Sequence, residues 1–471
     1  MTVVADRRLA TDLLDPDGSL DDLRRREYGR LDATATVYLD YTGGGLASDS
    51  QISAHAEYLR HCVLGNPHSA SRPSIAATLE AERARHAVLA FLGASPDDYE
   101  CVFTANASAA LKLVGEAYPW CPGGAFALTA DNHNSVNGIR ELARRAGACV
   151  EYVPVTAPEL RIDRDAMATT LAAPPRGPRL LAFPAQSNYS GVQHPLDIVA
   201  QAHQHGWDVL LDASAYVPTN RLDLAAVGAD FVALSIYKIC GHPTGVGCLV
   251  ARRDRLAALR RPWFAGGTVT IASVGAGSHY LHDGAAGFED GTLNYASLPA
   301  VTSGLTHVEA VGREAIHHRV GVLTAWLLDL LPTLRHHNGA PLVSVLGPAT
   351  TAARGGTVTF LVRDPAGNAV DGRRIEALAG DRGIAVRSGC FCNPGAGEAA
   401  LGIDAATLAP WFGRQRPVTF DELASGMRRS GHTLGAVRVS FGIATNATDA
   451  ACLGEFLHDL IDVLAAPERV R

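Results

Sequence analysis

The feature that most constrains the fold is an alternation of short apolar runs with amphipathic segments between residues 101 and 254. Apolar runs bounded by Gly, Pro and Asn occupy 101–105, 125–130 and 180–185, and each is followed by a segment with helical spacing. Three more runs follow at 207–214, 230–238 and 246–254. Apolar strands joined by amphipathic helices are typical of βαβ units, in which the strands are parallel and helices cover both faces. The pattern predicts a large α/β domain.

The character of the chain changes near residue 309. A long helix is predicted over 308–331, followed by a strand at 356–362, a helix at 371–383, and a final strand and helix at 435–442 and 453–465. This order predicts a smaller α+β domain. We therefore expect three units, which are an N-terminal arm (1–35), a large α/β domain (36–308) and a small C-terminal domain (309–471). Ligands of open parallel sheets bind beyond the carboxyl ends of the strands, so the polar residues that end the runs are the candidates for a site.

Composition excludes several classes of protein. Lys and Arg total 41 and Asp and Glu total 48, which gives 41 − 48 = −7 and argues against a nucleic-acid or membrane-surface protein driven by basic charge. No apolar run reaches the roughly 18 residues that span a bilayer, and the N-terminus carries charges where a signal peptide would be apolar. The nine cysteines form no CxxC pair and no zinc-like spacing, so we expect reduced thiols, no metal site and a cytoplasmic location.

Lysine is unusually rare, because only Lys112 and Lys238 occur. Lys238 ends an apolar run and precedes a Gly-rich loop, and Asp212 lies near the end of the run before it. Alone, Lys238 could be a surface residue and Asp212 could cap a helix. A desolvated amine has a lowered pKa and can form a Schiff base. Together with a carboxylate that keeps a pyridine nitrogen protonated, it makes the minimal set for pyridoxal phosphate (PLP).

A phosphate needs donors around it. Asn106, Ala107 and Ser108 open a predicted helix directly after the run 101–105, where free N–H groups and the helix dipole would face an anion. Ser235, shortly before Lys238, could add a hydroxyl. The alternative is that the serine only caps the helix.

Longer motifs give the chain a family resemblance. It resembles fold-type I PLP enzymes of the class V aminotransferase group, which contains the cysteine desulfurases, and within that group it is most similar to the N-terminal desulfurase domain of molybdenum cofactor sulfurases. The resemblance implies a large domain with a mainly parallel seven-stranded sheet and a smaller α+β domain. It spans roughly residues 38 to 460 and is carried, in family order, by YLDYTGGGLAS, GNPHSAS, FTANASAALKLVGEAYPW, LTADNHNSVNGIR, FPAQSNYSGVQHPL, LLDASAYVPT, LSIYKICGHPTGVGCLV, FEDGTLNY, VRSGCFCNPGAGE and GAVRVSFG.

The resemblance implies a role for each residue that would hold the cofactor. Lys238 would form the Schiff base, Asp212 would pair with the pyridine nitrogen, and Asn188 would contact the phenolic oxygen. His133 would stack on the ring, although it could simply cap the helix that begins near residue 134. The phosphate would be held by Ala107, Ser108, Ser235 and, from the neighbouring subunit of a homodimer, Thr268.

The resemblance also implies how an amino-acid substrate binds. Arg438, with Arg387 close by, would grip the substrate carboxylate, because a planar guanidinium holds a carboxylate bidentately. A buried structural ion pair is the alternative for Arg438. Cys392 would take sulfur as a persulfide on a mobile Gly-rich loop, where an accessible thiolate is a competent nucleophile. Cys392 and its neighbour Cys390 could instead be inert packing residues.

We therefore expect a PLP-dependent cysteine desulfurase that converts L-cysteine, or a related amino acid, to alanine and a persulfide on Cys392. The alternatives are a C–S lyase that yields pyruvate and ammonia, an epimerase or aminotransferase of the isopenicillin N epimerase kind, and a non-catalytic scaffold. The chain has Tyr237 where housekeeping desulfurases have His, and Ala215 where they have Gln. It stops at Arg471, whereas the sulfurases continue into a domain that binds the molybdenum cofactor. The sulfur acceptor is therefore left open, with another protein as one expectation.

Overall fold

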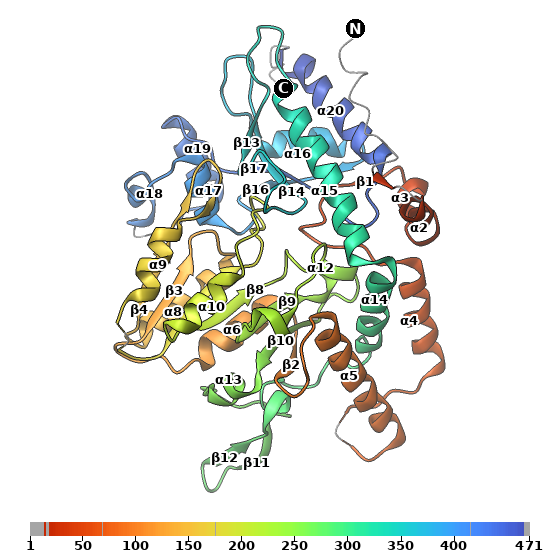
Figure 1. The fold of residues 1–471 in the computed structure, drawn as a ribbon, viewed down its shortest axis with the longest axis vertical. Coiled ribbons are helices and arrows are strands. Elements are labelled where there is room, and N and C mark those ends of the chain that lie inside the picture. Colours follow the sequence, from red (N-terminus) through yellow and green to blue (C-terminus); the bar gives the residue numbers. More distant parts are fainter. Residues whose placement is uncertain (1–13, 16–17, 68, 175, 415, 466–471) are drawn as a thin grey trace.

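Two sheets organise the molecule (Figure 1), which we analysed as a computed structural model that describes residues 14–15, 18–67, 69–174, 176–414 and 416–465. The larger sheet has seven strands in the order β2-β10-β9-β8-β7-β3-β4. Strands β3, β4, β7, β8 and β9 pair in parallel, as the sequence predicts. The bounds in chain order are β2 (Tyr99–Thr104), β3 (Ala125–Thr129), β4 (Cys149–Val153), β7 (Arg179–Pro184), β8 (Asp208–Asp212), β9 (Phe231–Ser235) and β10 (Gly247–Arg252).

The expectation of parallel strands is wrong for β10, which pairs antiparallel with both β9 and β2. Only residues 236 to 246 separate β9 from β10, and they include the short helix α12 (Ile236–Cys240). A parallel crossover needs a dozen or more residues, so this connection can only return the chain beside β9 in the opposite direction. The antiparallel strand brings Gly247 to the edge of the sheet where Lys238 lies.

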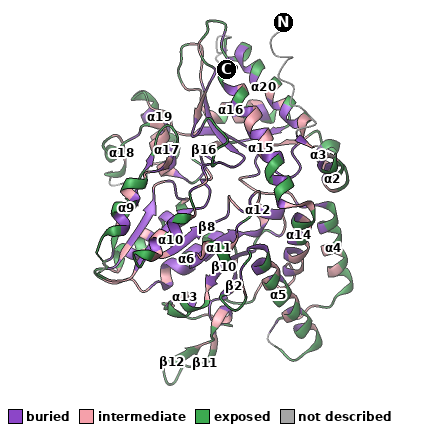
Figure 2. Cartoon of the chain, in the orientation of Figure 1, coloured by how far each residue is buried: buried purple, intermediate pink, exposed green. Residues whose placement is uncertain are grey.

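Both faces of the large sheet are covered, as Figure 2 shows by the purple strands inside greener helices. Consecutive strand residues point to opposite faces, so Leu180 and Leu210 join one core cluster while Leu181 and Leu211 join the other. Helices α6 and α8 pack on the first side and α10 on the second. The helices that precede or surround this sheet are α4 (Asp49–His61), α5 (Arg72–Phe91), α6 (Ala107–Ala117), α7 (Asn134–Asn137), α8 (Ile139–Arg145), α9 (Arg164–Ala172), α10 (Asp197–Gln204), α11 (Leu224–Val227) and α13 (Arg253–Ala258).

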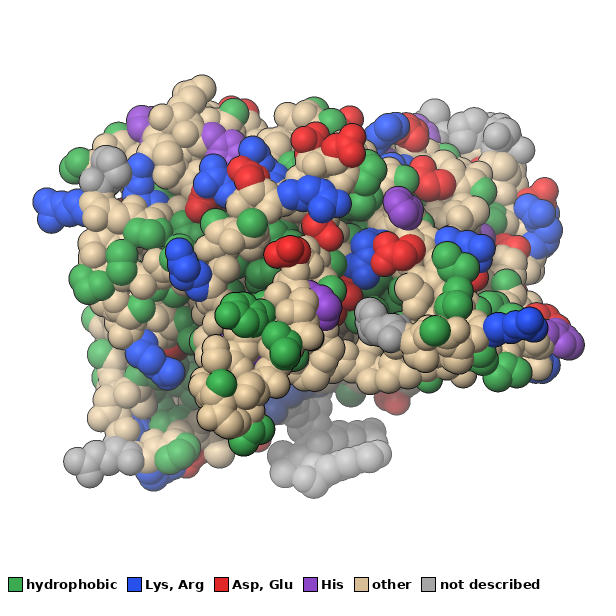
Figure 3. All heavy atoms as spheres, turned by 90° about the horizontal axis from the view of Figure 1, so that it is seen from below, with side chains coloured by type: hydrophobic (Ala, Val, Ile, Leu, Met, Phe, Trp, Pro, Cys, Tyr) green, Lys and Arg blue, Asp and Glu red, His purple; other side chains and the backbone are tan. Residues whose placement is uncertain are grey.

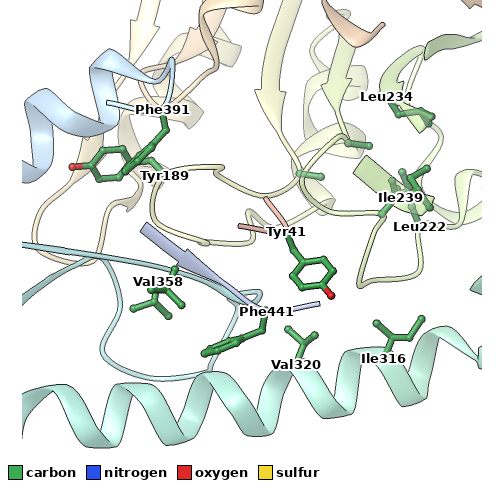
Figure 4. Close-up of a cluster of buried hydrophobic side chains, with 14 of the residues drawn as sticks. Tyr41, Tyr189, Leu222, Leu234, Ile239, Ile316, Val320, Val358, Phe391 and Phe441 are labelled. Atoms are coloured by element: carbon green, nitrogen blue, oxygen red, sulfur yellow. The ribbon is translucent and has the colours of Figure 1, made fainter. Parts of the chain in front are cut away.

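The C-terminal part has a four-stranded antiparallel sheet in the order β13-β14-β17-β16. Figure 4 shows Ile316 and Val320 on a long helix, α15, facing the cluster that contains Phe441 and Val358. The elements are α15 (Arg313–Leu330), β13 (Val343–Leu346), β14 (Thr357–Val362), α16 (Gly372–Gly380), β15 (Ile384–Ala385), β16 (Arg387–Gly389), α17 (Pro394–Leu401), α18 (Ala405–Phe412), α19 (Phe420–Arg429), β17 (Ala436–Ser440) and α20 (Ala447–Ala465).

The single long helix predicted over 308–331 is instead two helices, α14 (Leu298–Val311) and α15. Gly312 lies between them with φ 92°, a conformation that ends a helix and that residues with a side chain rarely adopt. The apolar spacing continues across the break, so periodicity alone could not reveal it.

The N-terminal segment lies against the C-terminal part. Helices α2 (Ser19–Glu27) and α3 (Arg30–Ala33) fall within the expected arm, of which residues 1–13 and 16–17 lie outside the described residues. Strand β1 (Val37–Tyr38) then pairs in parallel with β15. The start of the expected large domain thus joins the C-terminal lobe, and the domain boundaries stay a prediction.

Two features of the surface bear on function. A hairpin of β11 (Val269–Ser273) and β12 (Ser278–Leu281), which the sequence did not reveal, projects from the body in Figure 1 and exposes Ile271, Val274 and Tyr280. The face in Figure 3 carries basic and acidic side chains interspersed with hydrophobic ones. Among the helices of the described residues, none is long and apolar enough to cross a membrane.

Candidate active site

A cavity of about 210 Å³ lies where three parallel strands of the large sheet end. Its walls include Pro184 at the end of β7, Asp212 at the end of β8 and Ser235 at the end of β9. This is the edge at which open parallel sheets bind their ligands. The cavity is lined by Asn106, Ala107, Ser108, Leu111, His133, Ser135, Pro184, Gln186, Asn188, Asp212, Ser214, Ala215, Ser235, Tyr237 and Lys238.

Lys238 contributes the amine of this cavity from the short helix α12. Its Nζ makes no hydrogen bond or ion pair with any described residue. Burial lowers the pKa of Lys238, because desolvation disfavours the ammonium, and the nearby carboxylate of Asp212 opposes that effect. A larger fraction of this amine is therefore neutral, and nucleophilic, than for an exposed lysine.

Asp212 and His133 line the same cavity as Lys238. Asp212 Oδ1 accepts a hydrogen bond from the Ser214 N–H at 3.0 Å, which orients the carboxylate. His133 caps helix α7, because its Nδ1 accepts from the Ser135 N–H at 3.1 Å. Burial lowers the pKa of His133, so the ring is held in its neutral form. His133 therefore caps α7 and also lines the cavity, so its role as a cap does not exclude stacking on a ring.

The start of α6 forms a concave group of donors. Ser235 Oγ accepts a hydrogen bond from the Ala107 N–H at 2.9 Å, and Ser108 Oγ lies 2.6 Å from Ser135 Oγ. Gly247 makes the close approach of β10 possible, because a Cβ there would lie 2.5 Å from the backbone of Asn106. The hydroxyls and the positive end of an 11-residue helix fit a phosphate group. With Lys238 and Asp212 in the same cavity, these residues fit PLP.

Both predicted substrate arginines bind one carboxylate that the sequence analysis did not single out. Asp40 Oδ1 lies 2.9 Å from Arg438 Nη2, and Asp40 Oδ2 lies 2.5 Å from Arg387 Nη2. The Arg438 side chain is 3% exposed and that of Arg387 is 50% exposed. Burial lowers the pKa of Arg438, whereas the hydrogen bond to Asp40 raises the pKa of Arg387. Arg438 is therefore part of a buried ion pair, the alternative that the sequence left open.

Cys392 lies on an exposed loop next to the cavity. The backbone N–H of Asn134, the residue after His133, donates to the Cys392 carbonyl at 2.7 Å. Asn188, a cavity residue, donates from Nδ2 to the carbonyl of Phe391 at 2.8 Å. Phe391 and Cys392 have φ 55° and 54°, left-handed values that are uncommon without glycine. Cys392 and Cys390 are both exposed, so neither is a buried packing residue.

The loop is also connected to the arginines. The Arg438 guanidinium lies 4.7 Å from the centroid of the Phe391 ring, within the range of a cation–π contact. Arg438 Nη1 donates to the Asn188 carbonyl at 3.0 Å. Asn393, which is buried, donates from Nδ2 to Asn188 Oδ1 at 2.9 Å. These contacts connect Arg438 and the cavity residue Asn188 to the loop that carries Cys392.

Thr268 is not brought to this site. Its side chain is fully buried, and its hydroxyl is hydrogen-bonded to the backbone of Ala265 in its own loop. The predicted contact is with the phosphate of a neighbouring subunit, so it stays a prediction.

Sequence reasoning missed Asp40, Gln186, Ser214 and Asn393. A usable signal existed only for Asp40, which follows the apolar residues 37–39 as Asp212 follows its strand.

A model of the Aminotransferase class-V family matches residues 37–453. Molybdenum cofactor sulfurase of Bos taurus is 35% identical in an alignment 475 residues long, which covers 93% of this chain and 52% of that protein. The chain spans about half the length of the curated relatives it matches.

Two solved structures share the fold. The apo structure of a cysteine desulfurase from Thermococcus onnurineus NA1 has a TM-score of 0.78 at 24% identity and covers 94% of this chain and 98% of that one. A C-DES variant with glycine covalently linked to its PLP cofactor has a TM-score of 0.70 at 19% identity, covering 93% and 99%.

Proposed function

Because the chain belongs to the Aminotransferase class-V family, we propose that it is a PLP-dependent cysteine desulfurase. It removes sulfur from L-cysteine, or a related amino acid, and leaves alanine and a persulfide on Cys392. The observation that carries this proposal is the position of Cys392, an exposed thiol on a loop tied to the helix that His133 caps. A lyase or an epimerase would need no thiol there.

The predicted fold-type I architecture is confirmed by the likeness to cysteine desulfurase structures and by the mainly parallel large sheet. We assign the phosphate of the cofactor to the start of α6, with Ala107, Ser108 and Ser235. His133 would pack on the ring, Asp212 would hold the pyridine nitrogen, and Asn188 would contact the phenolic oxygen. When bound, PLP supplies an electron sink that stabilises negative charge at the Cα of an amino acid.

Lys238, Asp212 and His133 would then have separate roles in proton transfer and cofactor binding. Lys238, with its lowered pKa and no hydrogen-bonding partner among the described residues, would hold the cofactor and could accept the Cα proton of the substrate. Asp212 would keep the pyridine nitrogen protonated. The neutral ring of His133 would pack on the cofactor without adding a second positive charge beside Lys238.

Cys392 performs the sulfur transfer. Its thiolate attacks the substrate sulfur, so that an S–S bond forms while the substrate C–S bond breaks and its electron pair stays on Cβ. Protonation of that carbon gives alanine, so cysteine and the thiol yield alanine and a persulfide without an outside oxidant. Arg438 and Arg387 hold the substrate carboxylate, in competition with or beside Asp40.

Surface exposure and cysteine usage bear on the assembly and the cellular location. The projecting β11–β12 hairpin exposes apolar side chains that a second copy would cover, which supports a homodimer. Free cysteines throughout the described residues support a cytoplasmic location. The exposed persulfide is accessible to a sulfur-acceptor protein. Light scattering would measure the mass, and a monomer in wild type would contradict the homodimer.

Product analysis with L-cysteine and a thiol reductant tests the function. We expect alanine and sulfide in equal amounts from wild type and none from Cys392→Ala, while Cys390→Ala, a matched exposed thiol in the same loop, retains turnover. Pyruvate and ammonia unaffected by Cys392→Ala would establish a lyase instead. Racemised or transaminated substrate without sulfur release would establish the epimerase or aminotransferase alternative.

Cofactor binding is tested separately by absorbance. Purified protein should show the visible band of a lysine-bound PLP, and Lys238→Ala should lose it. Protein that stays colourless with added PLP would favour the scaffold alternative over any of the enzyme readings.

A further inference from the structure

A second, larger cavity of about 420 Å³ lies between α15 and the loop that precedes β14. Its volume falls in the range of about 300–1,000 Å³ that is usual for small-ligand sites. Its polar lining comes from both elements, with His317 and His318 on the helix and Thr351 and Arg354 on the loop. Among the described residues that line it, none is Asp or Glu.

Arg354 places a buried positive charge in the wall of this cavity. The residue is 4% exposed, and no carboxylate of a described residue pairs with it. Its guanidinium donates to the carbonyls of Pro348, Ser190 and Thr357, and its Nε has no hydrogen-bonding partner. Burial lowers the pKa of Arg354 to about 10, with Arg161 acting in the same direction.

A buried charge without a counter-ion is costly, and an anion in the adjoining cavity would lower that cost. The nearest charged residues do not supply one. Arg161 and Glu159 lie 3.8 Å apart and so largely cancel each other. The hydroxyl and imidazole groups of the lining are further groups that can donate hydrogen bonds to an oxyanion.

Hydrogen bonds connect this cavity to the first one. Gln193, in the wall of the second cavity, donates from Nε2 to Gln186 Oε1 at 3.2 Å and to Asn220 Oδ1 at 2.9 Å. Gln186 lines the first cavity, and His317 Nδ1 lies 2.9 Å from the same Asn220 oxygen. A small space of about 20 Å³, enough for one water, shares Gln186 with the first cavity and Thr219 with the second.

We propose that the cavity between α15 and the 351–355 loop is a second ligand site that binds a small oxyanion, a carboxylate or a phosphate group, against Arg354. The bound anion neutralises the buried guanidinium. Its presence is transmitted to the first cavity through Gln193 and Gln186. This inference stands on the second cavity and does not depend on the reaction proposed above.

The direct test is calorimetric titration of PLP-loaded protein with inorganic phosphate and with acetate, at an ionic strength held constant with chloride. Loading fills the phosphate cradle at α6, and the loss of binding in Gly321→Leu, described below, separates the second cavity from the arginines that would hold a substrate carboxylate. We expect saturable binding of at least one of the two anions. Preference for phosphate indicates a phosphate-bearing ligand, and preference for acetate indicates a carboxylate. No saturable binding of either anion would overturn the proposal.

Two variants locate the site. A Cβ at Gly321 meets nothing within 4 Å and the residue lines the cavity, so Gly321→Leu should fill the space and weaken binding at least tenfold. Gly380→Leu, on helix α16 with equally open surroundings, is the matched control and should bind as wild type does. Arg354→Met should also lose binding, but it removes three carbonyl contacts and could fail to fold. Gly321→Leu that binds like wild type would refute the location, whether or not the protein takes up PLP.

Discussion

Replacing Asp40 by Asn tests the ion-pair cluster most sharply. The substitution removes the negative charge but keeps the shape, and it leaves Arg438, whose side chain is 3% exposed, without its carboxylate. Breaking a buried pair by removing one partner costs about 3–5 kcal/mol. The Asn oxygen, the Asn188 carbonyl and the Phe391 ring still contact the guanidinium, so we expect the lower end, about 3 kcal/mol.

The second arginine supplies the control. Arg387 binds the other oxygen of Asp40, but its side chain is 50% exposed, and exposed pairs contribute about 0–1 kcal/mol. Arg387→Gln should therefore lower the free energy of unfolding by less than about 1 kcal/mol. In the double variant Asp40→Asn with Arg438→Gln, the two losses should not add, because both residues belong to one pair.

The assay is urea unfolding of the cofactor-free protein, followed by circular dichroism and tryptophan fluorescence, with the free energy extrapolated to water. A cost below about 1 kcal/mol for Asp40→Asn, or an equal cost for Arg387→Gln, would contradict a strong buried pair between Asp40 and Arg438. Either result would mean that Arg438 is well solvated or satisfied by the backbone alone.

Three further substitutions test the cavity. Lys238→Met should make the cofactor-free protein more stable than wild type at pH 7, because burial lowers the folded-state pKa of the amine and its protonated form carries the full desolvation cost. That stability difference should shrink as the pH rises through the lowered pKa and vanish above about 10.5, where the amine is neutral in both states. Thermal melts that show the same difference between Lys238→Met and wild type at pH 7 and pH 11 would contradict this. Gly247→Ala should weaken PLP binding at least tenfold in an absorbance titration, because its Cβ would lie 2.5 Å from the backbone that starts α6, whereas Gly380→Ala should not. Ser235→Ala leaves the buried Ala107 N–H without its acceptor, which should cost about 1–3 kcal/mol in thermal unfolding and weaken PLP binding; unchanged binding would exclude the serine from the cradle.

Local pattern predicted most of the large sheet, because each buried strand shows its apolar run directly. The local pattern could not predict the direction of β10, because that direction depends on how far the residues between β9 and β10 can reach. The hairpin β11–β12 escaped for a different reason. It is exposed on both faces and therefore has no apolar periodicity to read.

The same contrast holds in the site. Asp212 and Lys238 could be singled out because one ends a buried strand and the other lies three residues beyond one, where a charged side chain is unusual. Asp40 gave an equivalent signal, but its role depends on Arg387 and Arg438, which lie 347 and 398 residues further along the chain. Sequence spacing cannot predict contacts between residues so far apart in the chain. The second cavity likewise depends on packing between α15 and a distant loop.

The pairing of β1 with β15, and of Asp40 with Arg438, can form only after the C-terminal part of the chain has been synthesised. At about 5–20 residues per second, the 398 residues between Asp40 and Arg438 take roughly 20–80 s to emerge from the ribosome. The seven-stranded sheet ends at residue 252 and can form well before that time. The nascent chain therefore holds Lys238 and Asp212 in place while Asp40 still has no arginine to bind. A chain truncated before residue 387 would keep the residues that line the first cavity but would lack both arginines that bind Asp40.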